Sequence, residues 1–253
     1  MSQIKYKTSE NTSYYILFKA THYNKISKKR INDPKYIFRN SLKIVKKKFK
    51  IFKDKKIIDL GCANGEFLNY ISKSINKENK LYGVDISNEF IKTAKSHLEG
   101  SIMLETKDLF KVNGRYDVIF CMCTAQIFPK IEKFLSKVIK LMAKNSIAVI
   151  QGRFNKADCD VIIKFRDRSV VNKNIWRCDF NVHSEKTINE FLKKYRKSIK
   201  WKFKYSYIDR KIKRKKNNPD VYTYTFKDSE NNYRVTSGLK ILYDPEFLII
   251  EKN

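Results

Sequence analysis

KIIDLGCANGEF, at residues 56–67, is the stretch that decides the fold of this chain. It predicts a short strand, a tight turn and the start of a helix. The two isoleucines are β-branched and suit a central parallel strand that is buried on both faces. Gly61 and Gly65 suit the turn, because glycine has no side chain to obstruct the backbone or an approaching ligand. Asp59 falls at the carboxyl end of the strand, where open α/β sheets bind their ligands.

The spacing of the turn distinguishes between two ligands. A dinucleotide turn reads G-x-G-x-x-G and places a diphosphate at the helix N-terminus. That pattern would fall on Gly61, Ala63 and Glu66, so two of its three positions fail and a carboxylate would face the diphosphate. The pattern present is D-x-G-x-x-x-G, beginning at Asp59. A carboxylate there suits the ammonium group of S-adenosylmethionine, which NAD lacks, so the sign of the charge favours S-adenosylmethionine.

Acidic residues also follow the next strands. Asp85 ends the second predicted strand and is placed to accept hydrogen bonds from ribose hydroxyls. Ile86 would then cover one face of the adenine. Asp108 comes after the third strand and is placed to receive the exocyclic amine of adenine, with Leu109 against the ring. Together with the turn at Asp59 and a fourth predicted strand, YDVIF at 116–120, these residues give four signals in order, which indicate one nucleoside site at a single edge of the sheet.

These motifs together resemble the class I S-adenosylmethionine-dependent methyltransferases, and the resemblance covers residues 35–253. IIDLGCANG is similar to motif I of that family, LYGVD to its acidic loop, KDLF to its adenine loop and YDVIF to its motif IV. Ala63 departs from the pattern, because many members have a second glycine there. The resemblance implies a site for S-adenosylmethionine formed by Asp59, Gly61, Cys62, Ala63, Gly65, Asp85, Ile86, Asp108, Leu109 and Cys121.

Strands and helices alternate along most of the chain. Alternation of this kind predicts a parallel sheet with helices on both faces. An alternating stretch at 199–207 and an apolar one at 247–251 supply two further strands. We therefore expect an α/β, Rossmann-like, seven-stranded and mostly parallel sheet whose last strand is antiparallel. The other strands are expected at 56–60, 81–85, 101–105, 116–121 and 146–151, and helices at 65–75, 87–98, 129–143 and 185–197.

The 253 residues suit a single domain with additions to this minimal fold. Residues 1–50 are expected to form a flap and a helix, with Tyr14, Tyr15 and Phe18 either in the flap or in plain packing. Asp33-Pro34 predicts the helix start, as an N-cap followed by proline at N1. Residues 152–183 and 209–243 are expected to be insertions on the substrate side. The second of these holds a β-hairpin between strands six and seven, formed by 221–226 and 233–236.

The formal net charge of +29 allows two interpretations. It suits a protein that binds a polyanion such as RNA. The sequence is also rich in Lys, Ile and Asn, whose codons are A/T-rich, so codon usage alone can raise the lysine content. No apolar run is long enough to cross a membrane and no signal peptide is apparent, so we expect a cytoplasmic protein. Five cysteines without a zinc-type spacing predict neither a disulfide framework nor a metal site.

Methyl transfer from a sulfonium needs positioning above all, and a general base where the acceptor must lose a proton. His183 is the first candidate base by residue type, and Asp158 and Asp160 are the others. The C-terminal segments QGRFN, IWRCDFNVHS, TYTF and FLIIEK resemble those of bacterial small-molecule or cell-surface-glycan methyltransferases. This resemblance implies that the acceptor is a small metabolite or a sugar of a cell-surface polysaccharide. An RNA methyltransferase using Lys193 to Lys216, with Trp201 interleaved, is the first alternative. A non-catalytic partner subunit is the second.

The motif makes one direct prediction. Asp59→Ala should abolish cofactor binding and leave the fold intact, because the substitution removes the proposed partner of the ammonium group. Calorimetric titration with S-adenosylhomocysteine measures the binding, with NAD as the control ligand. An unchanged affinity in the variant would contradict this assignment of the turn.

Overall fold

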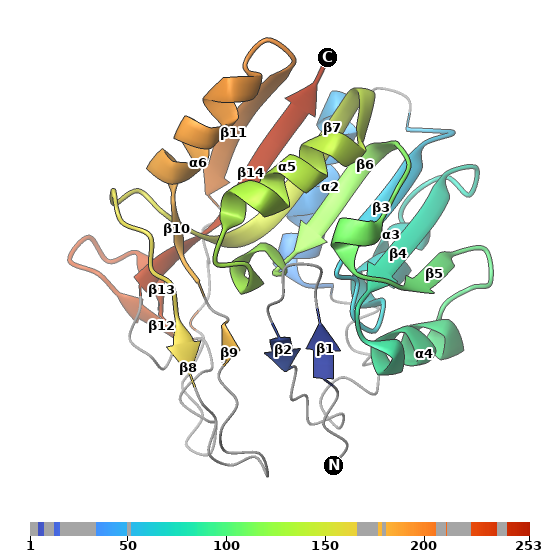
Figure 1. The fold of residues 1–253 in the computed structure, drawn as a ribbon, viewed down its shortest axis with the longest axis horizontal. Coiled ribbons are helices and arrows are strands. Elements are labelled where there is room, and N and C mark those ends of the chain that lie inside the picture. Colours follow the sequence, from blue (N-terminus) through green and yellow to red (C-terminus); the bar gives the residue numbers. More distant parts are fainter. Residues whose placement is uncertain are drawn as a thin grey trace.

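The chain folds around one large mixed sheet with helices on both faces (Figure 1). The computed structural model describes residues 5–7, 13–15, 34–49, 52–165, 177–178, 181–205, 211, 224–236 and 242–253.

Five parallel strands form the centre of the sheet. Their order is β5, β4, β3, β6 and β7, so the strand order reverses direction between β3 and β6. Such a switch point is where doubly wound sheets bind ligands. The bounds are β3 (Lys56–Leu60), β4 (Lys80–Asp85), β5 (Met103–Thr106), β6 (Tyr116–Met122) and β7 (Met142–Asn155).

The strands beyond β7 at this edge of the sheet are antiparallel to their neighbours. β14 (Leu242–Lys252) lies antiparallel to β7, and β11 (Ile199–Tyr205) lies antiparallel to β14. The hairpin of β12 (Tyr224–Lys227) and β13 (Tyr233–Thr236) continues onto the first residues of β14. The predicted Rossmann-like sheet, with an antiparallel last strand and a hairpin before it, is thus confirmed.

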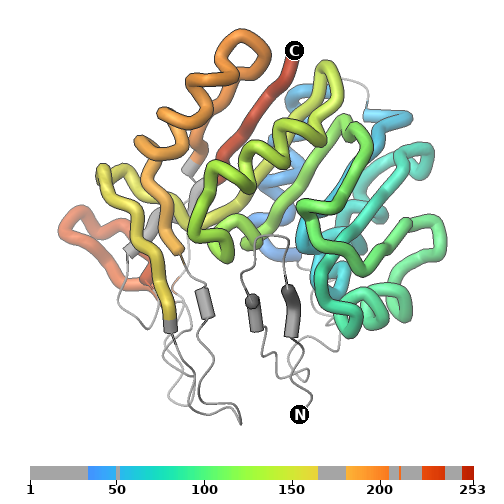
Figure 2. The backbone as a smooth tube through the Cα atoms, in the orientation of Figure 1, coloured from blue at the N-terminus to red at the C-terminus, as the bar shows by residue number. Residues whose placement is uncertain are grey.

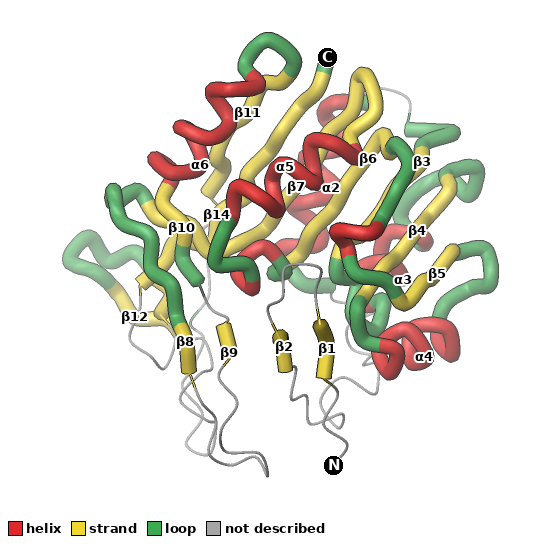
Figure 3. Tube along the Cα trace, viewed as in Figure 1, coloured by secondary structure: helices red, strands yellow, loops and turns green. Residues whose placement is uncertain are grey.

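The helices cover the two faces of the sheet and bury two apolar cores (Figure 3). One core lies under α2 (Tyr36–Lys48), α3 (Glu66–Ser72) and α4 (Asn88–His97). The other lies under α5 (Ile131–Leu141) and α6 (Glu185–Leu192). Neighbouring residues of β3 point to opposite faces, so Ile57 joins the first core and Ile58 the second. A strand with both faces covered is mostly apolar, as Ile57, Ile58 and Leu60 are, and the buried acid Asp59 lies near its carboxyl end.

Short elements complete the described chain. Three turns of 3₁₀-helix follow β5, β6 and α6, and four of the five short strands pair in two hairpins, β1 with β2 and β8 with β9. The bounds are η2 (Leu109–Lys111), η3 (Ala125–Ile127), η4 (Lys193–Tyr195), β1 (Lys5–Lys7), β2 (Ser13–Tyr15), β8 (Lys164–Phe165), β9 (Arg177–Cys178) and β10 (His183–Ser184).

Several predicted boundaries were wrong. Helix α2 begins at Tyr36 rather than at Pro34, because Lys35 is non-helical at ψ 139° and is the N-cap, and its carbonyl accepts from the N–H groups of Phe38 and Arg39. β7 extends well beyond the predicted 146–151, because β14 pairs with it as far as Phe154. Helix α6 was expected to reach residue 197 but ends at Leu192, where a 3₁₀ turn redirects the chain into β11.

Two other predictions have a limited test. The side chains of Tyr14 and Tyr15 and the whole of Phe18 lie outside the described residues, so the aromatic flap stays a prediction. Among the helices that the structure describes, none combines the length and apolar character needed to cross a bilayer. The smooth backbone trace shows the path of the described segments from end to end (Figure 2).

Candidate active site

The glycine turn lies at the switch point and is bonded to the neighbouring strand. The backbone N–H groups of Gly61 and Cys62 both donate to the carbonyl of Val84, at 2.8 and 3.0 Å. Gly61 has φ +79°, in the left-handed region that favours glycine. A β-carbon added at Gly61 would collide with the side chain of Thr124. The turn is therefore packed against the end of β6 as well as bonded to β4.

Ala63 occupies a position in this turn that favours glycine. Its φ is +47°, which places an alanine in the left-handed region. Its backbone N–H donates to Oδ2 of Asp85 at 2.9 Å, and this bond holds the strained residue in place. Alanine in place of a second glycine therefore strains the backbone, and this effect is larger than the addition of one methyl group suggests.

Asp59 is a buried carboxyl group with unmet hydrogen-bonding capacity. The residue is 1% exposed, and its Oδ1 has no hydrogen-bond partner among the described residues. Burial, and then the nearby charge of Asp85, raises the pKa of Asp59 from 3.8 to about 8. Removing a carboxyl group from water without a partner costs free energy. A cationic group bound beside Asp59 would offset this cost and return the carboxyl group to its ionised form.

Asp85, at the end of β4, connects the glycine turn to the start of α4 through hydrogen bonds. Its Oδ1 accepts from the N–H of Ser87 at 2.9 Å, while Oδ2 accepts from Ala63. Burial raises the pKa of Asp85, and these backbone hydrogen bonds oppose that rise. Each carboxylate oxygen has two acceptor positions, so Asp85 can still accept from hydroxyl groups of a ligand. Ile86 follows at once and is half-buried.

The third strand leads into a capped turn. Oδ1 of Asp108 accepts from the N–H of Phe110 at 2.9 Å and caps the 3₁₀ turn that begins at Leu109. Leu109 is buried in the core under α5, and Asp108 is half-buried. The structure therefore gives Asp108 a definite local role as a cap. Its predicted contact with adenine stays a prediction.

The cysteines near the turn are buried in the two cores. Cys62 and Cys121 are 5% and 0% exposed, and burial raises the pKa of each thiol. A buried thiol with a raised pKa is a poor nucleophile. Cys123 is exposed, and its Sγ donates to Oε1 of Gln151 at 2.7 Å. In the part of the chain that the structure describes, no group of three or more His, Cys, Asp or Glu side chains could hold a metal ion.

The three predicted candidate bases lie in different surroundings. Asp158 is a surface residue whose side chain is 66% exposed, and it pairs with Lys186 at 2.8 Å. Asp160 receives hydrogen bonds from the N–H of Ser184 at 2.7 Å and from the hydroxyl of Thr187 at 2.6 Å. Asp160 therefore braces the start of α6, where Ser184 is the N-cap. The structure brings Asp160 close to His183 and leaves Asp158 apart from them.

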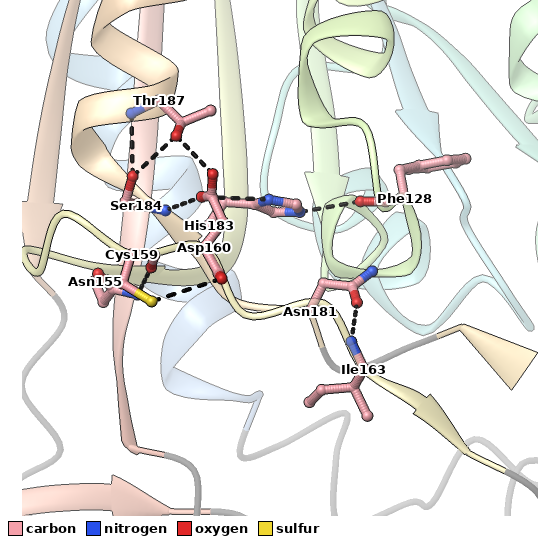
Figure 4. A network of polar contacts seen from close by, with 9 residues as sticks. All are labelled: Phe128, Asn155, Cys159, Asp160, Ile163, Asn181, His183, Ser184 and Thr187. Atoms are coloured by element: carbon pink, nitrogen blue, oxygen red, sulfur yellow. Dashed lines mark hydrogen bonds and ion pairs between the residues drawn. The ribbon is translucent and has the colours of Figure 1, made fainter.

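His183 is the buried centre of a polar network (Figure 4). Its side chain is 2% exposed, with Nδ1 at 4.0 Å from Oδ1 of Asp160. Nε2 lies 3.0 Å from the carbonyl oxygen of Phe128. A carbonyl oxygen only accepts, so Nε2 carries the hydrogen and donates it. Burial lowers the pKa of His183 below 6.5, while Asp160 and the bond to Phe128 oppose this shift. The catalytic role of all three residues stays a prediction.

Sequence reasoning missed Thr124 and Arg153 as parts of the framework. Thr124 fills the space that a side chain at Gly61 would need. Its position directly after the fourth strand was visible in the sequence, but no motif marked it. Arg153 is only 6% exposed although it lies near the carboxyl end of β7, beyond the predicted strand. An arginine in an apparently irregular segment gave no sign that it would be buried.

These observations define the class of protein. The sheet has the order of the class I methyltransferases, with a D-x-G-x-x-x-G turn at its switch point and an acid at the end of the next strand. Asp59 supplies an unpaired buried carboxyl oxygen, and Asp85 keeps free acceptor positions. This donor and acceptor set fits an adenosine ligand with a cationic amino-acid tail. It does not fit a diphosphate, because like charges would meet.

A family comparison leads to the same class. The family model described as "Methyltransferase domain" matches residues 51–208. The chain belongs to this family. With the site described above, this makes it an S-adenosylmethionine-dependent methyltransferase.

Solved structures share the fold. The plantazolicin methyltransferase BpumL, solved with S-adenosylhomocysteine, has a TM-score of 0.54 and 17% identity, over 93% of this chain and 92% of that one. The YcgJ protein from Bacillus subtilis has a TM-score of 0.54 and 10% identity, over 85% and 98% of the two chains.

One curated protein is similar in sequence over a shorter stretch. The mitochondrial ubiquinone biosynthesis O-methyltransferase of Saccharomyces cerevisiae is 28% identical over 99 residues. The match spans 35% of this chain and 31% of the yeast protein.

The turn predicts opposite effects for two substitutions. Ala63→Gly should raise the free energy of unfolding by about 1 kcal/mol, because it relieves a left-handed alanine at a small cost in chain entropy. Gly61→Ala should lower it by about 2–4 kcal/mol, because it adds both backbone strain and a collision with Thr124. Urea denaturation measures both. If Ala63→Gly lowered the free energy of unfolding as much as Gly61→Ala does, the strain at Ala63 would not be significant.

The raised pKa of Asp59 predicts how stability changes with pH. The folded protein holds a proton at Asp59 up to about pH 8, whereas the unfolded chain loses it near 3.8. Stability of the ligand-free protein should therefore fall as pH rises between these values. Asp59→Asn, which cannot ionise, should make the dependence flatter. Urea midpoints across this range provide the measurement, and an equally steep decline in the variant would assign the effect to another group.

Proposed function

We propose that this enzyme methylates a small-molecule acceptor held at the carboxyl edge of the sheet. The observation that carries the proposal is the buried Asp59 at the switch point, whose Oδ1 has no hydrogen-bond partner in the described part of the chain. The related proteins support the class of acceptor. BpumL was solved with desmethyl analogues of plantazolicin, and the yeast relative is named for ubiquinone biosynthesis.

Each cofactor-binding residue has a proposed role. Asp59 pairs with the ammonium group of the amino-acid tail, and Asp85 accepts from the ribose hydroxyls. Ile86 and Leu109 contact the adenine, and Asp108 accepts from its amine. The glycine turn, with Gly61, Cys62, Ala63 and Gly65, lets the ligand approach the backbone. Cys121 lies in the core behind these groups and supports the end of β6.

The chemistry asks little of the protein beyond positioning. S-adenosylmethionine supplies an electrophilic methyl group on a sulfonium centre. The protein has to hold the acceptor atom in line with that methyl group and exclude water. Asp158 lies in an exposed ion pair and Asp160 is bonded to the start of α6, so neither is presented as a free base. This arrangement favours an acceptor that can attack the methyl group without a general base, because it is itself nucleophilic or only weakly basic.

A sugar of a surface polysaccharide is a particular case of this proposal, and a cytoplasmic location is part of it. The sequence similarity that suggested a sugar acceptor is looser than the match in motif I. A screen of acceptors that includes free sugars and sugar nucleotides tests this case directly. The non-catalytic alternative is set aside, because the chain belongs to the methyltransferase family and keeps the site residues.

RNA is the second candidate acceptor, and one surface favours it. Lys202 and Lys204 are exposed on the edge strand β11, on the same face of the sheet as α2. Lys43 and Lys47 of α2 are close enough that they lower the pKa of Lys204, after the larger effect of burial. We call these four residues the lysine shelf. Like charges gathered in this way suit an anionic polymer.

The aromatic residues of the same strand argue against RNA. Trp201 and Phe203 point to the other face, where they pack against the core under α5 and α6. The indole N–H of Trp201 donates to Oδ1 of Asn189 at 2.7 Å, and Phe203 meets Phe154 edge to face. Rings held in this way cannot stack on bases. Most of the predicted basic track beyond Tyr205 lies outside the described residues.

An acceptor screen tests the proposal. The purified protein is incubated with S-adenosylmethionine labelled on the methyl group, together with phenols, amines, azole peptides, sugars or total RNA. We expect label in a low-molecular-mass product and none in RNA. Asp59→Ala is the matched control, and it should transfer no label. Label found only in the RNA fraction would overturn the proposal in favour of the second candidate.

The lysine shelf adds a quantitative control. If RNA is the substrate, its affinity should fall steeply with salt, and replacing all four shelf lysines by Gln should reduce the slope by up to about 3. Lys92, Lys95, Lys133 and Lys140 lie on other helices and form the matched set for comparison. For a small-molecule enzyme, neither set should change methyl transfer.

A further inference from the structure

His183 belongs to β10, which occupies the place beside β7 that a longer β6 would take. β6 pairs with β7 as far as Met122 and Gln151, and β10 then pairs with β7 at Phe154 and Asn155. β14 already occupies the other edge of β7 at Phe154, so β10 lies on the edge that β6 has left. The segment 181–184 therefore stands at the carboxyl edge of the sheet, next to the connection between β6 and α5.

Two hydrogen bonds tie this segment to that connection. The N–H of Asn181 donates to the carbonyl of Gln126 at 3.1 Å. The Nε2–H of His183 donates to the carbonyl of Phe128 at 3.0 Å. In the close view, the imidazole extends from β10 directly toward the Phe128 carbonyl (Figure 4). The return of the 152–183 insertion thus fastens residues 124–128 to the sheet.

Residues 124–128 in turn contact both parts of the cofactor site. Thr124, at the start of the connection, packs against Gly61 of the glycine turn. Phe128, at its end, meets Phe110 edge to face, with ring centroids 5.5 Å apart. Phe110 belongs to the turn that Asp108 caps. A change in the position of the connection would therefore disturb the amino-acid side and the adenine side of the site together.

The imidazole presents neither of its nitrogens to an acceptor molecule. Nε2 is committed to Phe128, and Nδ1 faces the carboxylate of Asp160. Asp160 is itself held by Ser184 and Thr187, so it keeps its place beside the ring. The ring is almost wholly buried. A general base has to reach the proton that it removes, and this ring is turned away from any such approach.

We infer that His183 is a positioning residue: it holds the connection 124–128, and through it the glycine turn and the adenine turn, in the shape that binds the cofactor. The inference rests on the cofactor site of the proposed function and extends it to a residue that contacts no ligand. It assigns the insertion 152–183 a part in forming the cofactor site through its final residues.

The test compares three variants by calorimetric titration with S-adenosylhomocysteine. His183→Ala removes the imidazole donor that ties the connection 124–128 to β10, so we expect the affinity to fall by about tenfold. His183→Gln places an amide N–H as many bonds from Cβ as the imidazole Nε2, so its affinity should stay within about threefold of the wild type. His97→Gln, on the exposed end of α4, is the matched control and should change nothing.

Other outcomes would overturn the inference. A general base would touch only the acceptor, so it predicts unchanged cofactor affinity in His183→Ala and loss of methyl transfer in both His183 variants. Loss of affinity in folded His183→Gln would also overturn it, because the donor is kept. If His183→Ala does not fold, which thermal unfolding shows, His183→Gln alone decides. Absence of binding by the wild type would instead contradict the cofactor assignment itself.

Discussion

The arrangement of the site depends on the close packing of Gly61 against Thr124. The turn after β3 and the connection after β6 can meet only because Gly61 has no side chain. Hydrogen bonds from the turn to Val84 then bring in β4, so the ends of three central strands converge on one place. Asp59 and Asp85 are carried there by their strands, and the connection 124–128 closes the arrangement from the other side. One missing side chain thus governs the geometry of the whole cofactor edge.

The electrostatics of the site are opposite to those of the protein as a whole. The chain carries a net charge of +29, yet two buried carboxyl groups lie at its switch point. Burial raises the pKa of both, and a cation bound beside Asp59 would favour its ionised form. None of the lysines whose side chains the structure describes is buried, some of them pair with acids, and the lysine shelf is on the side of α2 and β11. Net charge therefore describes the surface and not the chemistry of the site.

The central strands and the cofactor turn could be predicted because their signals are local. A buried parallel strand is mostly apolar, and the turn needs glycine at fixed positions, so β3 was predicted to the residue. The ends of other elements were wrong where a distant partner decides them. β7 extends because β14, from the other end of the chain, pairs with it. That partner cannot be inferred from residues close in sequence.

The sequence by itself determined the class of sheet, the glycine turn and the acids that follow the strands, because each is set by residue type and short spacing. Only the tertiary structure decided what the single residues do. It turned both nitrogens of His183 toward protein groups, left Asp158 at the surface, and gave Thr124 the space beside Gly61. These outcomes depend on contacts between segments far apart in the chain, and such contacts form only when the sheet brings its strand ends together.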